Sequence, residues 1–154
     1  MGTRHRGSTD EVRALDLFIK LMRAAESVAT RVHRALADAD LTVSQFGVME
    51  AVFHLGPMCQ KDLGAKLLKS GGNITMVVDN LEKRGLARRK RNPENRKYVT
   101  VSLTDAGRRL IERIFPRHVA EVVREVAVLS ADEQATLAGL LRTLGLGVCG
   151  TAAS

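Results

Sequence analysis

The sequence predicts a mainly α-helical protein with one small β-hairpin, and three observations lead to that fold class. Apolar residues recur every three or four positions along most of the 154 residues, which is the period of an amphipathic helix. One stretch, 98–103, instead alternates apolar and polar residues as a half-buried strand does. Capping, glycine and proline residues separate these stretches, and the 45% apolar content suffices for the core of one domain.

A long amphipathic helix is predicted over residues 10–38, where the apolar side chains fall on one face. This length exceeds that of most helices in a small domain. Part of the apolar stripe therefore requires a partner from elsewhere, such as a second chain.

Two shorter helices are predicted next. Thr42 and Gln45 match a capping box, in which each side chain satisfies a free backbone donor at the helix start. Gly56 and Pro57 end that helix, because proline cannot extend it. A short third helix is expected over 59–68.

A turn is predicted at 69–72, and a fourth helix is predicted from Asn73 to a C-terminal cap at Gly85. Its apolar side consists of Ile74, Val77, Val78 and Leu81. The opposite side then exposes polar residues and one methionine, which are Asn73, Thr75, Met76, Asp79, Asn80 and Lys83.

After Gly85 the predicted hairpin pairs 86–91 with 98–103 across a turn at 92–95. A helix follows from Thr104 to about Val128, with a kink expected at Pro116. A second capping box at 130–133 opens a last helix that should stop at Gly145.

The net charge of +7 is concentrated in one segment. Residues 83–97 hold eight basic residues and one acidic residue, whereas the rest of the chain holds 16 of each. A basic excess confined to a hairpin indicates an element that binds a polyanion. Three short helices followed by such a hairpin describe a winged helix-turn-helix, flanked here by long N- and C-terminal helices that we expect to dimerise.

Four segments carry a resemblance to a known family: LTVSQFGVM (41–49), GPMCQKDLGAKL (56–67), NLEKRGLARR (80–89) and NPENRKYVTVSLTDAG (92–107). In this order they resemble the MarR family of bacterial transcriptional regulators, and the resemblance covers about 10–145. The family's wing pattern begins Asp-Pro-x-Asp-Arg-Arg. Here Pro93 and Arg96 are kept, while Asn92, Asn95 and Lys97 replace the two aspartates and the second arginine. A looser or more positive wing tip is therefore expected.

The resemblance implies five segments. We expect a disordered N-terminus at 1–9, an N-terminal dimerisation helix at 10–40, a winged helix-turn-helix DNA-binding lobe at 41–103, C-terminal dimerisation helices at 104–145 and a frayed tail at 146–154.

The fourth helix would enter a major groove of double-stranded DNA. Asn73 can bond adenine edges, Thr75 can bond base edges or phosphates, and Met76 can touch a thymine methyl group. The complete predicted set is Gly72, Asn73, Thr75, Met76 and Asn80. Asp79 suits DNA poorly and is expected to pair with a wing arginine instead.

Phosphate contacts are predicted from basic, hydroxyl and glycine residues near helix starts and on the hairpin. They are Gln60, Lys61, Lys69, Ser70, Gly71, Arg89 and Arg91. Arg96 and Lys97 at the wing tip are predicted to lie in or beside the minor groove, whose negative potential attracts arginine.

Ser70, Gly71 and Gly72 also raise the alternative of a nucleotide-binding loop. That loop needs a preceding strand and a GK[ST] or GxGxxG spacing, and the sequence has neither. An enzyme is not predicted, because we find no nucleophile–base pair, no carboxylate pair and no metal set.

The two cysteines do not indicate a disulfide framework. Cys59 lies at a predicted helix start, a position that favours the reactive thiolate, so an oxidant-sensing role stands as an alternative to an inert residue. His33, His54 and His118 lack metal-ligand spacing, and we predict no metal and no cofactor.

The function expected from the resemblance is a sequence-specific, double-stranded DNA-binding transcriptional regulator. It would act as a homodimeric repressor on a pseudo-palindromic operator and respond to a small aromatic or phenolic effector or an oxidant. It should be cytoplasmic, because no apolar run is long enough to span a membrane. The alternative is a winged-helix protein that binds RNA or a protein partner. Proteins that bind single-stranded RNA usually offer several aromatic side chains for stacking, and among the five aromatic residues here only Tyr98 could stack on a base.

Overall fold

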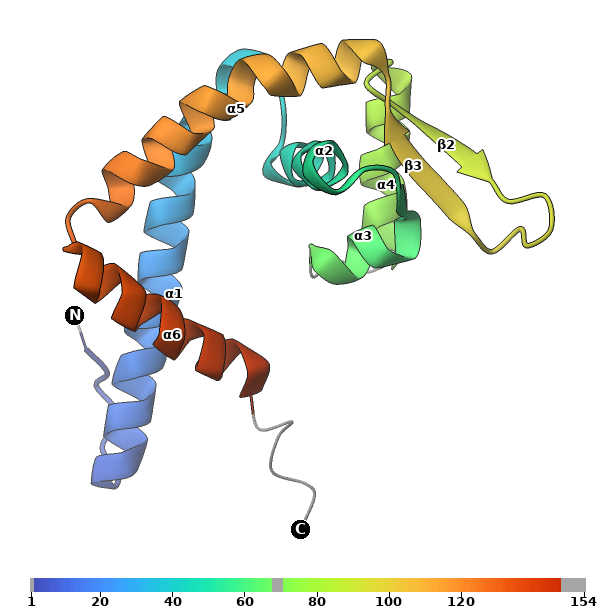
Figure 1. The fold of residues 1–154 in the computed structure, drawn as a ribbon. Helices are drawn as coiled ribbons and strands as arrows, with labels where there is room; N and C mark the ends of the chain where they lie inside the picture. The colour runs from blue at the N-terminus through green and yellow to red at the C-terminus, as the bar shows by residue number, and fades with distance from the viewer. Residues whose placement is uncertain (1, 68–70, 148–154) are drawn as a thin grey trace.

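The computed structural model describes residues 2–67 and 71–147. A winged lobe and a helical arm are joined by one long helix (Figure 1). Within the described ranges the elements follow in the order α1 Thr9–His33, η1 Arg34–Ala39, α2 Val43–Leu55, β1 Met58–Cys59, α3 Gln60–Lys66, α4 Gly71–Lys83, β2 Ala87–Arg91, β3 Val99–Leu103, α5 Asp105–Val126 and α6 Ala131–Leu146. The mainly helical class with a small sheet is confirmed.

The core of the lobe forms where α2, α3 and α4 pack on the sheet and on the first half of α5. The largest side chains with almost no exposure come from each of these elements, and they include Met49, Leu63, Leu81, Val101 and Ile111. Burial of these apolar side chains is the main force that holds the elements together. The lobe therefore presents α4 and the hairpin from a rigid base.

The sheet has three strands in the order β1-β3-β2, all antiparallel. The sequence predicted only the β2–β3 hairpin, which the structure confirms with Ala87 opposite Leu103 and Arg91 opposite Val99. The third strand, β1, pairs Met58 with Val101. Its two residues are too few to show an alternating pattern, and Cys59 falls instead in the helix predicted over 59–68.

Several predicted helix bounds were wrong. The helix expected over 10–38 ends at His33 and continues as η1, which closes at Asp40 in the left-handed region with φ 53°. Gly71 and Gly72 belong to the first turn of α4 rather than to a preceding turn. The last helix runs one residue past Gly145.

Other local predictions are confirmed. Thr42 and Ser130 cap α2 and α6 in the two predicted capping boxes. Gly85 follows α4 with φ 67°, a backbone conformation that glycine adopts without strain. Pro116 lies inside α5, which runs from Asp105 to Val126, and the kink expected there stays a prediction.

The helical arm consists of α1, α6 and the second half of α5. Ion pairs from Arg31 to Glu125 (2.6 Å) and from Arg117 to Asp38 (3.1 Å) tie the end of α1 and η1 to α5. Large apolar side chains nevertheless remain exposed along the arm, including Phe18, Met22, Val123, Leu140 and Leu144. None of the helices within the described ranges combines the length and apolarity needed to cross a membrane.

Candidate nucleic-acid interface

Helix α4 turns its apolar stripe inward and its polar residues outward, as the sequence predicted. Ile74, Val77, Val78 and Leu81 are buried in the lobe. Asn73, Met76 and Asn80 are exposed, and Met76 keeps 59% of its surface accessible. Because the apolar stripe of α4 faces the core of the lobe, these three exposed residues face outward.

The starts of α3 and α4 are linked by a short hydrogen-bond chain. Gln60 Nε2 donates to Thr75 Oγ1 at 2.8 Å, and Thr75 Oγ1 donates to the Gly71 carbonyl at 2.9 Å. The Gln60 Oε1 atom is buried and has no partner within the described part of the chain. Gln60 and Thr75, which were predicted to contact DNA separately, are thus held by one another.

A groove of about 570 Å³ lies between α3, the start of α4 and the foot of the wing. Its lining includes Gln60, Lys61, Ala65, Thr75, Lys97 and Val99. Lys61 and Lys97 reach the groove from different elements, because Lys61 lies on α3 and Lys97 precedes β3. Three parts of the sequence predicted to bind a polyanion therefore meet along one hollow.

The wing is anchored to α4 through Arg89 on β2. Its Nε and Nη2 atoms donate to Glu82 Oε2 at 2.9 and 2.8 Å, and Nη2 also pairs with the Asp79 carboxylate. The backbone N–H of Arg89 donates to Glu82 Oε1 at 2.7 Å. Burial opposes the charged guanidinium, but the hydrogen bonds that it donates to the Glu82 and Asp79 carboxylates, together with their negative charges, outweigh burial and raise the pKa of Arg89.

This anchoring bears on two predictions. The pairing of Asp79 with a wing arginine is confirmed. Arg89, however, was predicted to contact phosphate, and the structure directs its Nε and Nη2 edge into the lobe, where two carboxylates occupy it. The phosphate contact itself stays a prediction, and spacing along one strand cannot show which acidic residues of a neighbouring helix face Arg89.

The wing tip is ordered by two asparagine turns. Asn92 Oδ1 accepts the backbone N–H of Glu94 at 2.9 Å, and Asn95 Oδ1 accepts that of Lys97 at 3.1 Å. Arg96 and Lys97 are exposed, and within the described ranges neither forms an ion pair. The tip thus combines fixed backbone turns with unneutralised positive charge.

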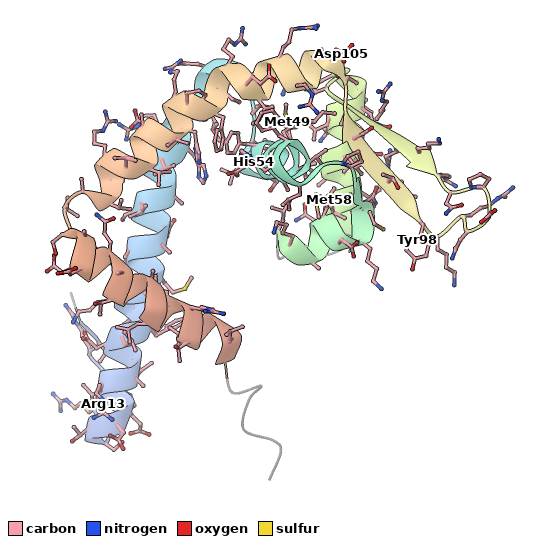
Figure 2. The ribbon with its side chains drawn as sticks, viewed as in Figure 1. Arg13, Met49, His54, Met58, Tyr98 and Asp105 are labelled. Atoms are coloured by element: carbon pink, nitrogen blue, oxygen red, sulfur yellow. The ribbon has the colours of Figure 1, made fainter. Side chains whose placement is uncertain are left out.

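The other predicted contact residues that the structure describes are Arg91, Gly71 and Gly72. Arg91 is exposed at the end of β2, and Tyr98 lies at the foot of the wing loop just before β3 (Figure 2). Among the described residues, a Cβ at Gly71 or Gly72 would meet nothing within 4 Å, so contacts with these residues do not require either glycine. The predicted phosphate contacts Lys69 and Ser70 fall outside the described residues.

Cys59 lies in β1 opposite Thr100 and is partly exposed. It precedes α3 as its N-terminal flanking residue, close to the predicted position at the helix start. Within the described ranges no group of three or more histidine, cysteine, aspartate or glutamate residues is placed to hold a metal ion.

A cluster of rings, hereafter the ring cluster, lies where the arm meets the lobe. It comprises His33, Phe46, His54, Phe115 and His118. The ring centroids of His118 and Phe46 are 4.5 Å apart, those of His54 and Phe115 are 4.6 Å apart, and His118 stacks on His33 at 6.1 Å. Burial lowers the pKa of His118. The spacing of these histidines along the sequence does not reveal their proximity, because it arises from the packing of α1, α2 and α5.

Comparisons with known proteins agree with this geometry. The sequence model of the MarR family matches residues 41–99. The HTH-type transcriptional regulator MhqR of Bacillus subtilis (strain 168) is 34% identical over 134 residues, which cover 87% of this chain and 92% of MhqR.

Two solved structures share the fold over most of their length. A MarR variant from E. coli, determined with operator DNA, matches with a TM-score of 0.77 and 24% identity over 84% of this chain and 94% of that one. BpsR of Bordetella bronchiseptica, whose DNA binding is regulated by 6-hydroxynicotinic acid, matches with a TM-score of 0.76 and 25% identity over 84% and 98%.

Proposed function

The chain belongs to the MarR family of DNA-binding transcriptional regulators, and from that premise we propose that it is a homodimeric, ligand-responsive repressor of a pseudo-palindromic operator. Family membership also separates it from enzymes. As a regulator of DNA it would act in the cytoplasm.

The observation that carries the proposal is the shared surface of α4 and the wing. The exposed side of α4 and the unpaired cations of the wing tip flank one groove, which Lys61 and Lys97 line. A helix in the major groove with a basic loop beside it is a recurrent way to combine base readout with phosphate binding. The basic excess of the chain is concentrated in residues 83–97, the segment that contains the wing.

Base readout is assigned to the outward side of α4, namely Gly72, Asn73, Thr75, Met76 and Asn80. Phosphate binding is assigned to Gln60, Lys61, Gly71 and Arg91, with Lys69 and Ser70 retained from the sequence. Arg96 and Lys97 would occupy the minor groove. The ion pairs of Arg89 support a different role for that residue, which is to hold the wing against α4.

The homodimer is supported by the apolar side chains that the arm leaves exposed. Phe18 on α1 is 59% accessible and Leu140 on α6 is 64% accessible, and both lie on stripes of similar residues. Soluble chains seldom leave such stripes uncovered. A second copy with the same stripes would bury them by symmetry and place two recognition helices about 34 Å apart, one turn of duplex DNA.

A small aromatic or phenolic effector is supported by the ring cluster and by BpsR, which responds to 6-hydroxynicotinic acid. The cluster lies between the arm and the lobe, so a flat ligand inserted there would change the angle between them. The buried His118 Nδ1 atom has no partner within the described residues, and a phenolic hydroxyl or carboxyl group of the ligand could pair with it. An oxidant acting on Cys59 remains the alternative signal.

The test begins with duplex DNA titrated at several salt concentrations. A steep linear fall of log affinity with log salt is expected, with a slope near −0.9 for each phosphate neutralised. A flat response would contradict the proposal, and preference for RNA would favour the alternative of an RNA-binding winged-helix protein.

Variants then separate the roles of the surface. Arg96→Ala should weaken binding to all duplexes and reduce the slope by about one. Asn73→Ala or Met76→Ala should change which DNA sequence is preferred, while the slope of log affinity against log salt should be unchanged. Arg113→Ala, which removes an exposed charge on α5 away from this surface, is the matched control.

A further inference from the structure

Arg84, the residue after α4, reaches away from the proposed DNA surface. Its Nη1 atom donates to the Asp40 carbonyl at 2.6 Å, and its Nη2 atom donates to the Ala39 carbonyl at 3.2 Å. A third contact joins Nη1 to Gln45 Oε1 at 3.4 Å. One guanidinium therefore connects the end of α4 with the end of η1 and the start of α2.

The two carbonyl groups belong to the turn that joins the arm to the lobe. Asp40 adopts a left-handed conformation with φ 53° and closes η1, where helix carbonyls lack intrahelical partners and carry partial negative charge. A cation is favoured at such an end. The flat fork of arginine can serve adjacent carbonyls at once, which the single ammonium of lysine does poorly.

Gln45 makes this contact more than a surface hydrogen bond. Its side chain is 8% exposed, and its Oε1 atom also accepts the Thr42 N–H at 3.1 Å in the capping box of α2. Arg84 thus connects the end of the recognition helix with the turn that closes η1 and with the cap of α2.

The residues assigned to base readout lie towards the opposite end of α4. Arg84 follows the C-terminal end of this 13-residue helix, whereas Asn73, Thr75 and Met76 lie near its N-terminus, more than ~12 Å away at 1.5 Å per residue. Arg84 belongs to the basic segment 83–97, yet its guanidinium donates to carbonyl groups of this chain.

We propose that Arg84 is a positioning residue that fixes the angle between recognition helix and arm, and thereby sets the operator half-site spacing that the dimer accepts. The inference rests on the proposed dimeric DNA-binding function. Without the guanidinium each lobe would still fold and read its half-site. The two lobes would no longer be held at one separation, so simultaneous binding would lose its preorganisation.

The experiment uses the full chain and a duplex that the wild-type protein selects from a random-sequence library. Binding is measured to this duplex, to its isolated half-site, and to versions with one base pair inserted at or removed from the centre. For Arg84→Met we expect full-site affinity to fall roughly tenfold, the scale of one lost charged hydrogen bond, with half-site affinity unchanged within about twofold. Discrimination against altered spacing should shrink, and Arg84→Lys should restore only part of it.

Matched measurements keep the inference distinct from a folding defect and from DNA contact. The salt slope of Arg84→Met should equal that of wild type, whereas a slope lower by one would mean that Arg84 binds phosphate and would overturn the inference. Equal losses on full site and half-site, or no loss on either, would also overturn it. Arg113→Met should behave as wild type. Failure of the wild-type protein to select any duplex would instead refute the proposed function, on which the inference depends.

Discussion

Arg89 of the wing and Glu82 of the recognition helix are joined by a two-point contact, with Nε and Nη2 of the guanidinium both donating to Glu82 Oε2 at 2.9 and 2.8 Å. The backbone N–H of Arg89 reaches the other carboxylate oxygen at 2.7 Å. The Arg89 side chain is 24% exposed and that of Glu82 is 32% exposed, so water screens the pair only partly. The wing and α4 therefore form one unit rather than two independent DNA-binding elements.

Arg89→Met should therefore weaken DNA binding by misplacing the wing, while leaving the salt slope at its wild-type value. The free energy of unfolding should fall by about 1–3 kcal/mol, because the Glu82 and Asp79 carboxylates lose their donor. Fluorescence anisotropy at several salt concentrations and urea unfolding measure the two effects. A slope reduced by one, as expected for Arg96→Ala, would restore Arg89 to the phosphate-binding set.

Gly107 in the first turn of α5 is required by its neighbour. A Cβ at this position would collide with the backbone carbonyl of Leu86, which cannot rotate away as a side chain would. Gly107→Ala should lower the free energy of unfolding by about 3 kcal/mol in urea titrations. Gly139→Ala on α6 is the control, because nothing lies within 4 Å of the added methyl group, and it should stabilise the protein by about 0.5–1 kcal/mol. Equal effects of the two changes would contradict the packing described here.

The exposed leucines of α6 should determine assembly. Leu140→Glu places a charge on the stripe proposed to meet the second copy. Sedimentation should then show a monomer, and the helical content of the variant should be unchanged. Val43→Glu is the control, because Val43 is similarly exposed at 51% but lies on α2 outside the arm. A Leu140→Glu variant that sediments as a dimer would place the interface elsewhere.

His118 should make stability sensitive to mild acid. Burial lowers its pKa and outweighs the attraction of the Glu50 carboxylate, while nearby His33 lowers it further. The unfolded chain, with a histidine pKa near 6.5, then binds the proton more readily than the folded chain. The free energy of unfolding should be fully present above that pH and fall as the pH drops through 6.5 towards the lowered folded value.

Urea unfolding between pH 7.5 and about 5, at one protein concentration, measures this dependence. His118→Phe keeps a ring in the apolar site and should flatten the curve. His5→Gln, a change at a histidine near the N-terminus whose side chain is 45% exposed, should leave it unaltered. If the free energy of unfolding of the wild-type protein does not change across this pH range, the lowered pKa of His118 is contradicted.

The sequence was sufficient wherever structure follows from neighbours along the chain. The Thr42–Gln45 capping box, the Gly85 cap and the alternation around Val101 depend on residues a few positions apart, and all three are confirmed. The sequence also predicted which side of α4 is buried and which is exposed, because the apolar stripe of this helix allows one way of packing.

Features that depend on tertiary contacts could not be predicted in this way. The destination of Arg89 depends on which acidic side chains α4 turns towards β2, and that of Arg84 depends on a turn more than forty positions earlier. The ring cluster forms only when the ends of α1, α2 and α5 converge. β1 is invisible to periodicity because its two residues become a strand only beside β3.

β3 is the central strand of the sheet, and its pairing with both neighbours limits how the wing can vary. Val101 is paired with Met58 on one side and with Arg89 on the other, so the register of β3 is fixed from both edges of the sheet. The ladder ends at Arg91 and Val99, one backbone hydrogen bond from the Asn92 N–H to the Tyr98 carbonyl follows it, and the loop between Asn92 and Tyr98 lies outside the sheet. Residues could be inserted there or removed without shifting the strands, which would let the reach of the wing along DNA be lengthened or shortened independently of the helix that reads the bases.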